Sequence, residues 1–397
     1  MTYDALVIGA GPAGATSALL LARAGWSVAV VEKAPFPRRK VCGEFLSATN
    51  WPLLYDLGIA NDCLQRAGPD VRRVGLFAGH TVLTAPMPQA WRSGGAWGRA
   101  MGREHFDQLL LRAAVRAGAK LWQPWRAISL HRARNGYRCT IIARESAREF
   151  AARVVIAAHG SWEPGSLPTQ AAEPHHPGDL LAFKAHVYDC DLPADLMPLL
   201  AFPGGYGGMV VSDGGRASLS CCIRRDALQR CRARYPAGHA AASLLRHIQA
   251  ASFGVREALW RAHLDGTWLA AGPIRPGIRK PPVAGIFLTG NTAGEAHPII
   301  AEGISMAMQS AWLLCRRLLA RQDEIGSDRA LAESGTLYAD DWHAAFAARI
   351  YAAAAFAHLT IRPQASAAWL PLVRLFPRLL TICAWLSGKT RQVIPAV

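Results

Sequence analysis

The spacing of three glycines near the start of the chain constrains its fold more than any other feature. Gly9, Gly11 and Gly14 follow an apolar run that is typical of a buried strand, and a helix-like stretch, 15–24, follows them. In such a unit the first glycine permits a tight turn, the second lets the backbone approach a pyrophosphate, and the third lets helix and strand pack closely. The pattern predicts an α/β unit that binds a dinucleotide at a helix N-terminus.

The residues that follow complete this prediction. A second apolar run, 27–31, ends at Glu32, where an acidic side chain would accept hydrogen bonds from a ribose. Strand, glycines, helix, second strand and acid occur in order within about 30 residues, which is far more specific than the glycines alone. The predicted nucleotide-binding residues here are Gly9, Gly11, Pro12, Ala13, Gly14, Glu32 and Lys33.

A second glycine-rich segment lies near the other end of the chain. Residues 286–304 read as a strand, a glycine turn, a proline and a glycine that opens a long helix. Together with the first glycines, this segment resembles the late motif of the superfamily of FAD-containing aromatic hydroxylases and geranylgeranyl reductases. Asn291 replaces the usual aspartate and Ala301 a usual glycine, although asparagine still offers an oxygen acceptor. The resemblance implies FAD as cofactor, with contacts from Gly290, Asn291, Pro298, Gly303 and Ile304.

A third segment, 36–45, resembles the R-x-K-x-C-G-E stretch of the reductase branch of that superfamily. There the cysteine and glycine lie close to the flavin, and the basic residues approach the FAD phosphates or ribose. Independently of the resemblance, three consecutive cations beside a pyrophosphate site are electrostatically favourable. The alternative is a solvated basic loop. The FAD contacts expected here are Arg39, Lys40, Cys42 and Gly43.

Three weaker matches lie between these segments. Residues 98–111 resemble the R-x-x-x-D-x-x-L helix, so that Arg103 corresponds to the arginine on the flavin side. His159 stands where the family carries an aspartate that, in the hydroxylase branch, serves both FAD and NADPH. Because this aspartate is replaced, the resemblance does not imply direct use of NADPH, and NADH or NADPH is only a candidate electron donor. Residues 202–208 resemble an aromatic stretch on the sheet that covers the substrate.

The composition favours a folded, intracellular enzyme. A chain of 397 residues with 51% hydrophobic residues can form a large core. Nine cysteines without a C-x-x-C pair argue against a disulfide framework and a zinc site, and no metal site is predicted. The first apolar run continues directly into the nucleotide turn, which indicates a strand and not a secretory signal. We expect a cytoplasmic location.

The net charge of +16 raises the question of an acidic partner. The arginines are scattered and no basic motif interleaved with aromatics stands out, so a nucleic-acid partner is not expected. FAD itself, a substrate carried by an acyl-carrier protein or CoA, and an anionic membrane surface are the candidates. The alternative is an arginine-rich composition unrelated to binding.

The expected fold class is α/β, with a Rossmann-like FAD-binding domain, an inserted antiparallel-sheet substrate domain and a helical C-terminal tail. Asn135-Gly136 predicts a hairpin, and residues 180–187, 208–211 and 217–223 read as strands of the antiparallel sheet. The expected domains are 1–74, 99–165 and 283–325 for FAD, 75–98 and 166–282 for the substrate, and 326–397 for the tail.

The tail reads as helices over 337–357 and 367–387. Residues 368–386 have the length of a membrane span, but two arginines and two prolines make insertion costly. One interpretation is peripheral contact with the inner face of the membrane. The other is packing against the FAD domain or a second subunit.

Because FAD carries the redox chemistry, few side chains need to react. The candidate catalytic residues are Cys42, by its family match, and Glu44 and His297, which lie in the two predicted flavin loops and could move protons. Glu295 and Glu302 are further candidates in the second loop. Lys184 and His186 alternate along one predicted strand, so they share a face that looks either into the pocket or to solvent.

Three functions remain open on this basis. The first is a reductase, similar to geranylgeranyl reductases, that transfers hydride to a hydrophobic isoprenoid, polyketide or lipid-like substrate. The second is an FAD monooxygenase that hydroxylates an aromatic or polyketide intermediate. The third is a non-catalytic or membrane-docked flavin-binding partner protein.

Overall fold

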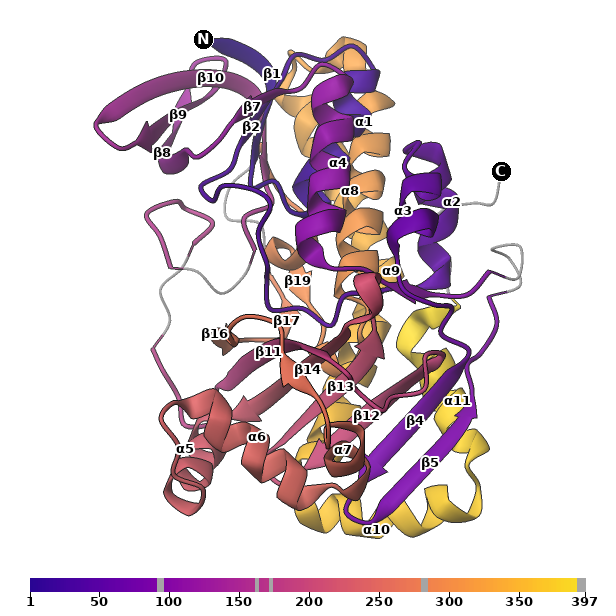
Figure 1. Ribbon diagram of the computed structural model, residues 1–397. Helices are drawn as coiled ribbons and strands as arrows, with labels where there is room; N and C mark the ends of the chain where they lie inside the picture. Colours follow the sequence, from indigo (N-terminus) through magenta and orange to yellow (C-terminus); the bar gives the residue numbers. More distant parts are fainter. Residues whose placement is uncertain (91–95, 161–163, 171–173, 280–284, 391–397) are drawn as a thin grey trace.

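The computed structural model describes residues 1–90, 96–160, 164–170, 174–279 and 285–390. The expected domain boundary at 283 lies outside these residues. Two large sheets form the frame, one above the other in Figure 1. Separate hydrophobic clusters fill the space beside each sheet.

The first sheet is built around parallel strands at the nucleotide site. Its order is β7-β2-β1-β10-β9-β8, and β18 pairs with β10. Strand β1 is central because it pairs with a strand on each side. Leu6 lies opposite Ala29 of β2 and Val155 of β10. The parallel strands are β1 (Thr2–Ile8), β2 (Val28–Val31), β7 (Lys120–Trp122), β10 (Ser146–Ala157) and β18 (Ile286–Leu288).

The hairpin predicted at Asn135-Gly136 is confirmed. It joins β8 (Arg126–Ala133) to β9 (Gly136–Ala143), which runs antiparallel to β10. Gly136 has a φ of +122°, and a Cβ there would lie 2.3 Å from the Ala152 carbonyl oxygen, so glycine is required.

Three helices pack together beside the first sheet (Figure 1). They are α1 (Pro12–Arg23), α4 (Arg103–Arg116) and α8 (Gly303–Leu319). The short helices α2 (Trp51–Asp56) and α3 (Ala60–Arg66) lie next to them. α1 begins where β1 ends, and α8 follows β18, so both N-termini lie at the carboxyl edge of the parallel strands.

The second sheet has the order β15-β11-β14-β13-β12-β4-β5, and β16 pairs with β11. Its strands are β4 (Arg73–Ala78), β5 (Thr81–Pro86), β11 (Leu180–Tyr188), β12 (Leu196–Phe202), β13 (Gly205–Val211), β14 (Ala217–Arg224), β15 (His263–Leu264) and β16 (Leu269–Ile274). The expected antiparallel pairing holds for its neighbouring strands except β4 and β12, which are parallel.

Shorter elements complete this half of the molecule. Helices α5 (Arg225–Arg234), α6 (Ala240–Ala251) and α7 (Phe253–Ala258) pack on the second sheet. Two small ladders pair β3 (Phe45–Leu46) with β6 (Arg99–Ala100), and β17 (Gly277–Ile278) with β19 (Gly294–Glu295).

The C-terminal helices differ in their bounds from those expected. They are α9 (Asp328–Ile361), α10 (Pro363–Leu375), α11 (Arg378–Ala384) and a π-helical turn, η7 (Trp385–Lys389). The chain leaves the helix at Phe376, with φ −128° and ψ 75°, because the following Pro377 disfavours helical geometry in the residue before it. The segment predicted as one helix is therefore two, bent by 110°.

Candidate functional site

The glycine turn after β1 forms a cradle that only glycine can line. Gly9 has a φ of +103°, and a Cβ there would lie 2.6 Å from the Ala158 carbonyl oxygen. A Cβ on Gly14 would lie 1.8 Å from the Gly9 carbonyl oxygen. Helix α1 begins after Gly11, and no described side chain caps this end. Its first amides are thus available to an anion, as a pyrophosphate requires.

Glu32 is fixed at the end of β2 by its own neighbours. Its Oε2 accepts a hydrogen bond from the Ala10 amide at 2.9 Å, and its Oε1 accepts one from the Ala34 amide, also at 2.9 Å. Arg38 lies 3.3 Å from the same carboxylate. The carboxylate keeps further acceptor sites, so it remains suited to a ribose.

Two cations lie beside the glycine turn. Arg103 is buried and is held by Asp107 through two hydrogen bonds of 2.7 and 2.8 Å, and a Cβ on Gly11 would lie 3.7 Å from its guanidinium. Burial, together with Arg103 and Arg38, lowers the pKa of Lys40 to about 8. An anion held between these groups would reverse that effect, and this donor set fits the FAD pyrophosphate.

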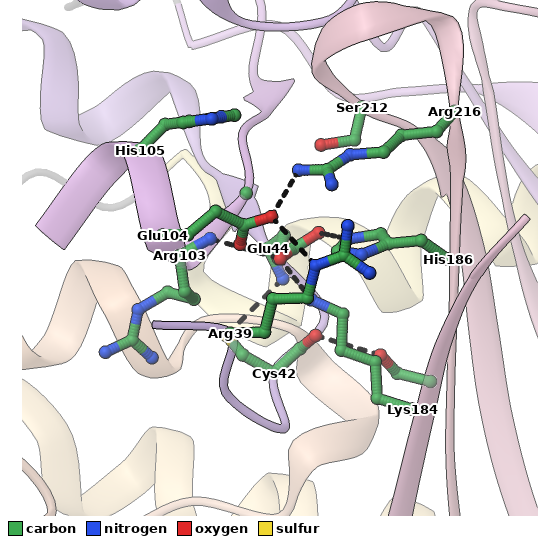
Figure 2. A network of polar contacts seen from close by, with 12 residues as sticks. Arg39, Cys42, Glu44, Arg103, Glu104, His105, Lys184, His186, Ser212 and Arg216 are labelled. Atoms are coloured by element: carbon green, nitrogen blue, oxygen red, sulfur yellow. Dashed lines mark hydrogen bonds and ion pairs between the residues drawn. The ribbon is translucent and has the colours of Figure 1, made fainter. Parts of the chain in front are cut away.

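The loop that carries Cys42 and Glu44 ends in a buried cluster of charges. Glu44 is fully buried and adopts a left-handed backbone with a φ of 62°. Its Oε1 forms an ion pair with the Lys184 ammonium group, and its Oε2 lies 2.7 Å from His186 Nε2. We call Glu44, Lys184 and His186 the Glu44 cluster. Figure 2 shows it at the junction of the loop and strand β11.

The protonation of Glu44 follows from these contacts. Burial raises the pKa of its carboxyl group, but the hydrogen bond with His186 and the charge of Lys184 lower the pKa to about 2. The Arg103 amide also donates to Glu44 Oε1 at 3.1 Å. Glu44 is thus ionised at neutral pH and fully engaged. These contacts suit a residue that holds the loop in position. They suit a residue that transfers protons less well.

A second layer of ion pairs surrounds this cluster (Figure 2). Arg216 lies 2.7 Å from Glu104 and 3.0 Å from Asp213. Arg39 lies 2.6 Å from Asp265 and 3.4 Å from Glu104. These pairs join the start of α4, and the loop that carries Arg39, to the second sheet and to the connection between its strands β15 and β16. Arg39, expected to contact FAD, therefore uses its guanidinium for this junction while it also lines the cavity.

The second flavin loop lies between β18 and α8. Asn291 Nδ2 donates to Glu295 Oε1 at 2.8 Å, and Arg279 donates to the Asn291 carbonyl oxygen at 2.6 Å. Ala301, where the resemblance leads one to expect glycine, has a φ of 52°, a left-handed conformation in which alanine is strained. Glu302, just before α8, is fully buried and pairs with Lys389 at 3.2 Å.

A single cavity of about 750 Å³ connects these loops. All the predicted FAD contacts except Gly14 line it, as do Cys42, Glu44, Glu295 and His297; Gly14 instead packs α1 against the turn, and the further candidates Glu302, Lys184 and His186 lie outside the lining. The opposite wall comes from the second sheet and the C-terminal helices and is mainly apolar. It includes Met197, Leu199, Val210, Phe356, Leu380 and Ala384.

A polar pair joins the second sheet to the second flavin loop: Tyr206 on β13 and His297 just before Pro298. The Tyr206 hydroxyl lies 3.1 Å from His297 Nδ1, and both residues line the cavity. Burial lowers the pKa of His297 to about 4 and raises that of Tyr206. At neutral pH the imidazole is therefore neutral, and its tautomer decides which of the two residues donates the hydrogen bond. Cys42 lines the same cavity, and its Sγ accepts from the Glu44 amide at 3.4 Å.

Sequence reasoning missed several residues of this site. The sequence predicts that Lys184 and His186 face either the pocket or solvent. In the structure they are instead buried against Glu44. Their alternation on one strand was the available signal. Tyr206 lies in the aromatic stretch 202–208, but nothing in the sequence distinguishes it from its neighbours there. Lys389, 70 residues beyond α8, carried no signal at all.

Comparisons with known proteins agree with this geometry. Residues 2–336 match the family described as "FAD binding domain". The chain is 30% identical over 161 residues to a menaquinone reductase of Mycobacterium tuberculosis, covering 41% of this chain and 38% of that protein. It is 32% identical over 172 residues to a digeranylgeranylglycerophospholipid reductase of Methanosphaerula palustris, covering 40% and 38%. The match thus spans well under half the length of these curated relatives.

Solved structures extend the likeness to the whole fold. The myxobacterial chondrochloren halogenase, an FAD-dependent halogenase, superimposes with a TM-score of 0.76 at 19% identity, covering 99% of this chain and 94% of that one. A geranylgeranyl bacteriochlorophyll reductase-like protein from Thermoplasma acidophilum gives 0.68 at 19% identity, covering 100% and 93%. The glycine cradle, the cations beside it and the family match together lead to one conclusion: the chain belongs to the FAD binding domain family.

Proposed function

We propose that this protein is a reductase that hydrogenates a carbon–carbon double bond in an apolar isoprenoid, polyketide or lipid-like substrate. The observation that carries the proposal is the apolar wall opposite the nucleotide loops, made by the second sheet and the C-terminal helices. In this reading, the second sheet is the substrate domain and the helices from α9 onward close it. The local similarity to two enzymes named as reductases supports the same direction.

The groups that would hold FAD are those described above. The turn of Gly9 and Gly11 with the α1 N-terminus, and the charge of Lys40, suit the pyrophosphate, while Glu32 suits the ribose. The loops at Cys42 and at His297 border the part of the cavity that faces the apolar wall. When bound and reduced, FAD supplies the hydride in this chemistry.

The chain itself must supply the proton for the second carbon. Tyr206 keeps its hydroxyl proton because burial raises its pKa, and neutral His297 orients that hydroxyl through Nδ1. Cys42 offers a second proton, on Sγ, at the same cavity. The apolar wall excludes water and aligns a long hydrocarbon chain. Tyr206 is our first choice for the proton donor because its position is fixed by a hydrogen bond.

The test is anaerobic. The FAD-loaded protein is reduced with dithionite, NADH or NADPH, and a polyprenyl alkene is added while the flavin absorbance is recorded. We expect reoxidation without oxygen and a product heavier by two hydrogens. Tyr206→Phe should slow this step by about 100-fold, the usual scale for a lost general acid. The exposed Tyr55→Phe is the control.

Other results would decide against the reductase. A product that forms only after oxygen is admitted, and carries an oxygen atom, would identify a monooxygenase. Reduced flavin that never reoxidises with any alkene, while the protein binds a second enzyme, would favour a flavin-binding partner protein. Full activity of Tyr206→Phe would remove Tyr206 from the mechanism without affecting the reaction class.

A further inference from the structure

The C-terminal helices expose an unusual number of large apolar side chains. Eight of the 17 large apolar residues that are exposed in the described chain lie between 351 and 386. Leu375 is 71% exposed and Trp385 58%. We call this set the C-terminal apolar surface, and it consists of Tyr351, Leu359, Leu372, Leu375, Phe376, Ile382, Trp385 and Leu386. Isolated exposed apolar residues are normal, but such a concentration marks an interaction surface.

The charge of the same segment points to the chemistry of its partner. After Asp341, the sequence contains no aspartate or glutamate through to residue 397, but it contains six lysines and arginines, of which Arg349 and Lys389 are buried, the latter against Glu302. Arg362 and Arg378 are exposed at the ends of α10 and at the start of α11. Apolar side chains flanked by cations, without acids, are typical of segments that lie in the interface of an anionic lipid bilayer.

Two other occupants fit less well. A symmetric dimer would place the same surface of two copies together, which brings cationic segments against each other. A membrane span would place Arg374 and Arg378 in the hydrocarbon, and the helix pair is bent by 110° at Pro377. Helix α9 is long and apolar enough to span a bilayer, but it packs against α8 and the second sheet. A position of these helices in the interface of the bilayer is the one that agrees with both the charges and the bend.

The surface also meets the cavity. Leu380, Cys383 and Ala384, on α11, line the cavity, whereas Ile382 and Trp385 are exposed. Leu386 does both: it lines the cavity and is 56% exposed. The apolar wall of the site is thus continuous with the C-terminal apolar surface at this residue.

We propose that the C-terminal apolar surface docks on an anionic phospholipid bilayer, with α10 and α11 in its interface. An apolar substrate then passes from the bilayer into the cavity beside Leu386 without crossing water. The docking stands on the surface and its charge alone, whereas the entry route rests on the proposed function.

Vesicle cosedimentation of the full-length, FAD-loaded protein tests the docking without any turnover. Vesicles of phosphatidylcholine with phosphatidylglycerol are compared with vesicles of phosphatidylcholine alone. We expect binding to the anionic vesicles that weakens with added salt. The double variant Leu375→Glu with Trp385→Glu should bind at least about tenfold more weakly, because it places two charges in the bilayer interface. Neither residue lines the cavity.

The matched control is Trp260→Glu, which changes an even more exposed tryptophan, at 78%, outside the surface. It should bind vesicles as the wild type does, and the flavin spectra of all variants should coincide. Two results of cosedimentation would overturn the docking: wild type that stays in the supernatant, or a double variant that binds as well as wild type. A third would be a wild-type dimer in ultracentrifugation that binds no vesicles and is absent in the double variant.

The entry route has its own readout. If wild type docks and the double variant does not, an alkene embedded in vesicles should be reduced more slowly by the double variant than by wild type, whereas a short water-soluble alkene should be reduced equally by both. Equal rates on the embedded alkene would overturn the route and leave docking standing. Docking without reduction of any alkene would contradict the proposed function and leave docking standing.

Discussion

At the scale of single residues, Glu44 connects the two halves of the molecule. Its backbone lies in the loop that borders the cavity, and its carboxylate is shared by two residues of β11. The ion pair is buried, so its attraction is offset by the cost of removing the charges from water. The net stabilisation is small, but the loss of one member leaves an uncompensated charge. The cluster therefore fixes the loop geometry more than it adds stability.

This argument predicts the effect of Glu44→Gln. The variant keeps the shape of the side chain but leaves the buried Lys184 without its counter-ion, which should lower the free energy of unfolding by about 3 kcal/mol. Chemical denaturation measures this change, and the retained flavin absorbance reports on the loop. Glu333→Gln, which removes a carboxylate paired on the surface with Arg321 and Arg329, should change stability little. Equal effects of the two variants would refute the role of Glu44.

The Glu44 cluster also shows where sequence reasoning ends at this scale. Gly9, Gly11 and Glu32 could be assigned because their contacts are local and the spacing reports them. Glu44 and Lys184 are 140 positions apart, and only the topology of the second sheet brings them together. The alternation of Lys184 and His186 indicated a shared face, but nothing in the sequence identified what that face meets.

At the scale of elements, the packing of α1 on the turn after β1 sets the nucleotide site. Gly14→Ala would place a Cβ 1.8 Å from the Gly9 carbonyl oxygen and 3.2 Å from Ala158 Cβ, so the helix must move away from the sheet. We expect FAD affinity to fall by more than about tenfold, since the helix N-terminus is displaced. The measure is the ratio of flavin to protein absorbance after purification and titration.

The control for this prediction is another helical glycine. Gly335→Ala in α9 would place a Cβ 3.6 Å from the Phe287 ring, which is ordinary contact, and alanine favours a helix. This variant should retain FAD and gain slight stability. If Gly14→Ala also retained FAD with wild-type affinity, the close packing of α1 would not be what shapes the site.

Elements differed in how far they could be predicted. The nucleotide unit and the β8–β9 hairpin were predicted because glycine positions determine them locally. The start of α9 was missed, although Ser327 caps it by accepting from the Ala330 amide at 3.4 Å. The break between α10 and α11 depends on Pro377, whereas Pro371 lies inside α10 without ending it. Two prolines in one apolar run gave no way to decide between them.

At the scale of the whole molecule, two half-buried histidines make stability depend on pH. Burial lowers the pKa of His159 and of His297 to about 4, against 6.5 when unfolded. Between these values the unfolded chain binds protons that the folded chain does not, so stability is complete above pH 6.5 and is lost as the pH falls towards 4. Below pH 4.5 the Glu44 carboxyl binds a proton in the unfolded chain but stays ionised in the folded one down to about pH 2, which adds to the loss.

We therefore expect Tm to fall by several degrees between pH 7 and pH 4.5. His297→Asn should show a shallower fall over the same range, since one of the two histidines no longer titrates. Replacing the exposed His80 by Asn serves as the control and should leave the slope unchanged. A Tm that is flat down to pH 4.5 in the wild type would contradict the burial of these imidazoles.

The order of the strands in the first sheet has a consequence for how the protein is made. β1 and β2 leave the ribosome first, but β10, which pairs with β1, follows some 150 residues later, and β18, which pairs with β10, some 280 residues later. Until β18 has emerged, β10 has an unpaired edge, and until α8 has emerged, α1 lacks one of the helices that pack against it. The nascent chain must therefore carry an incomplete sheet through most of its synthesis, the condition in which unpaired strands associate wrongly and chaperones are needed.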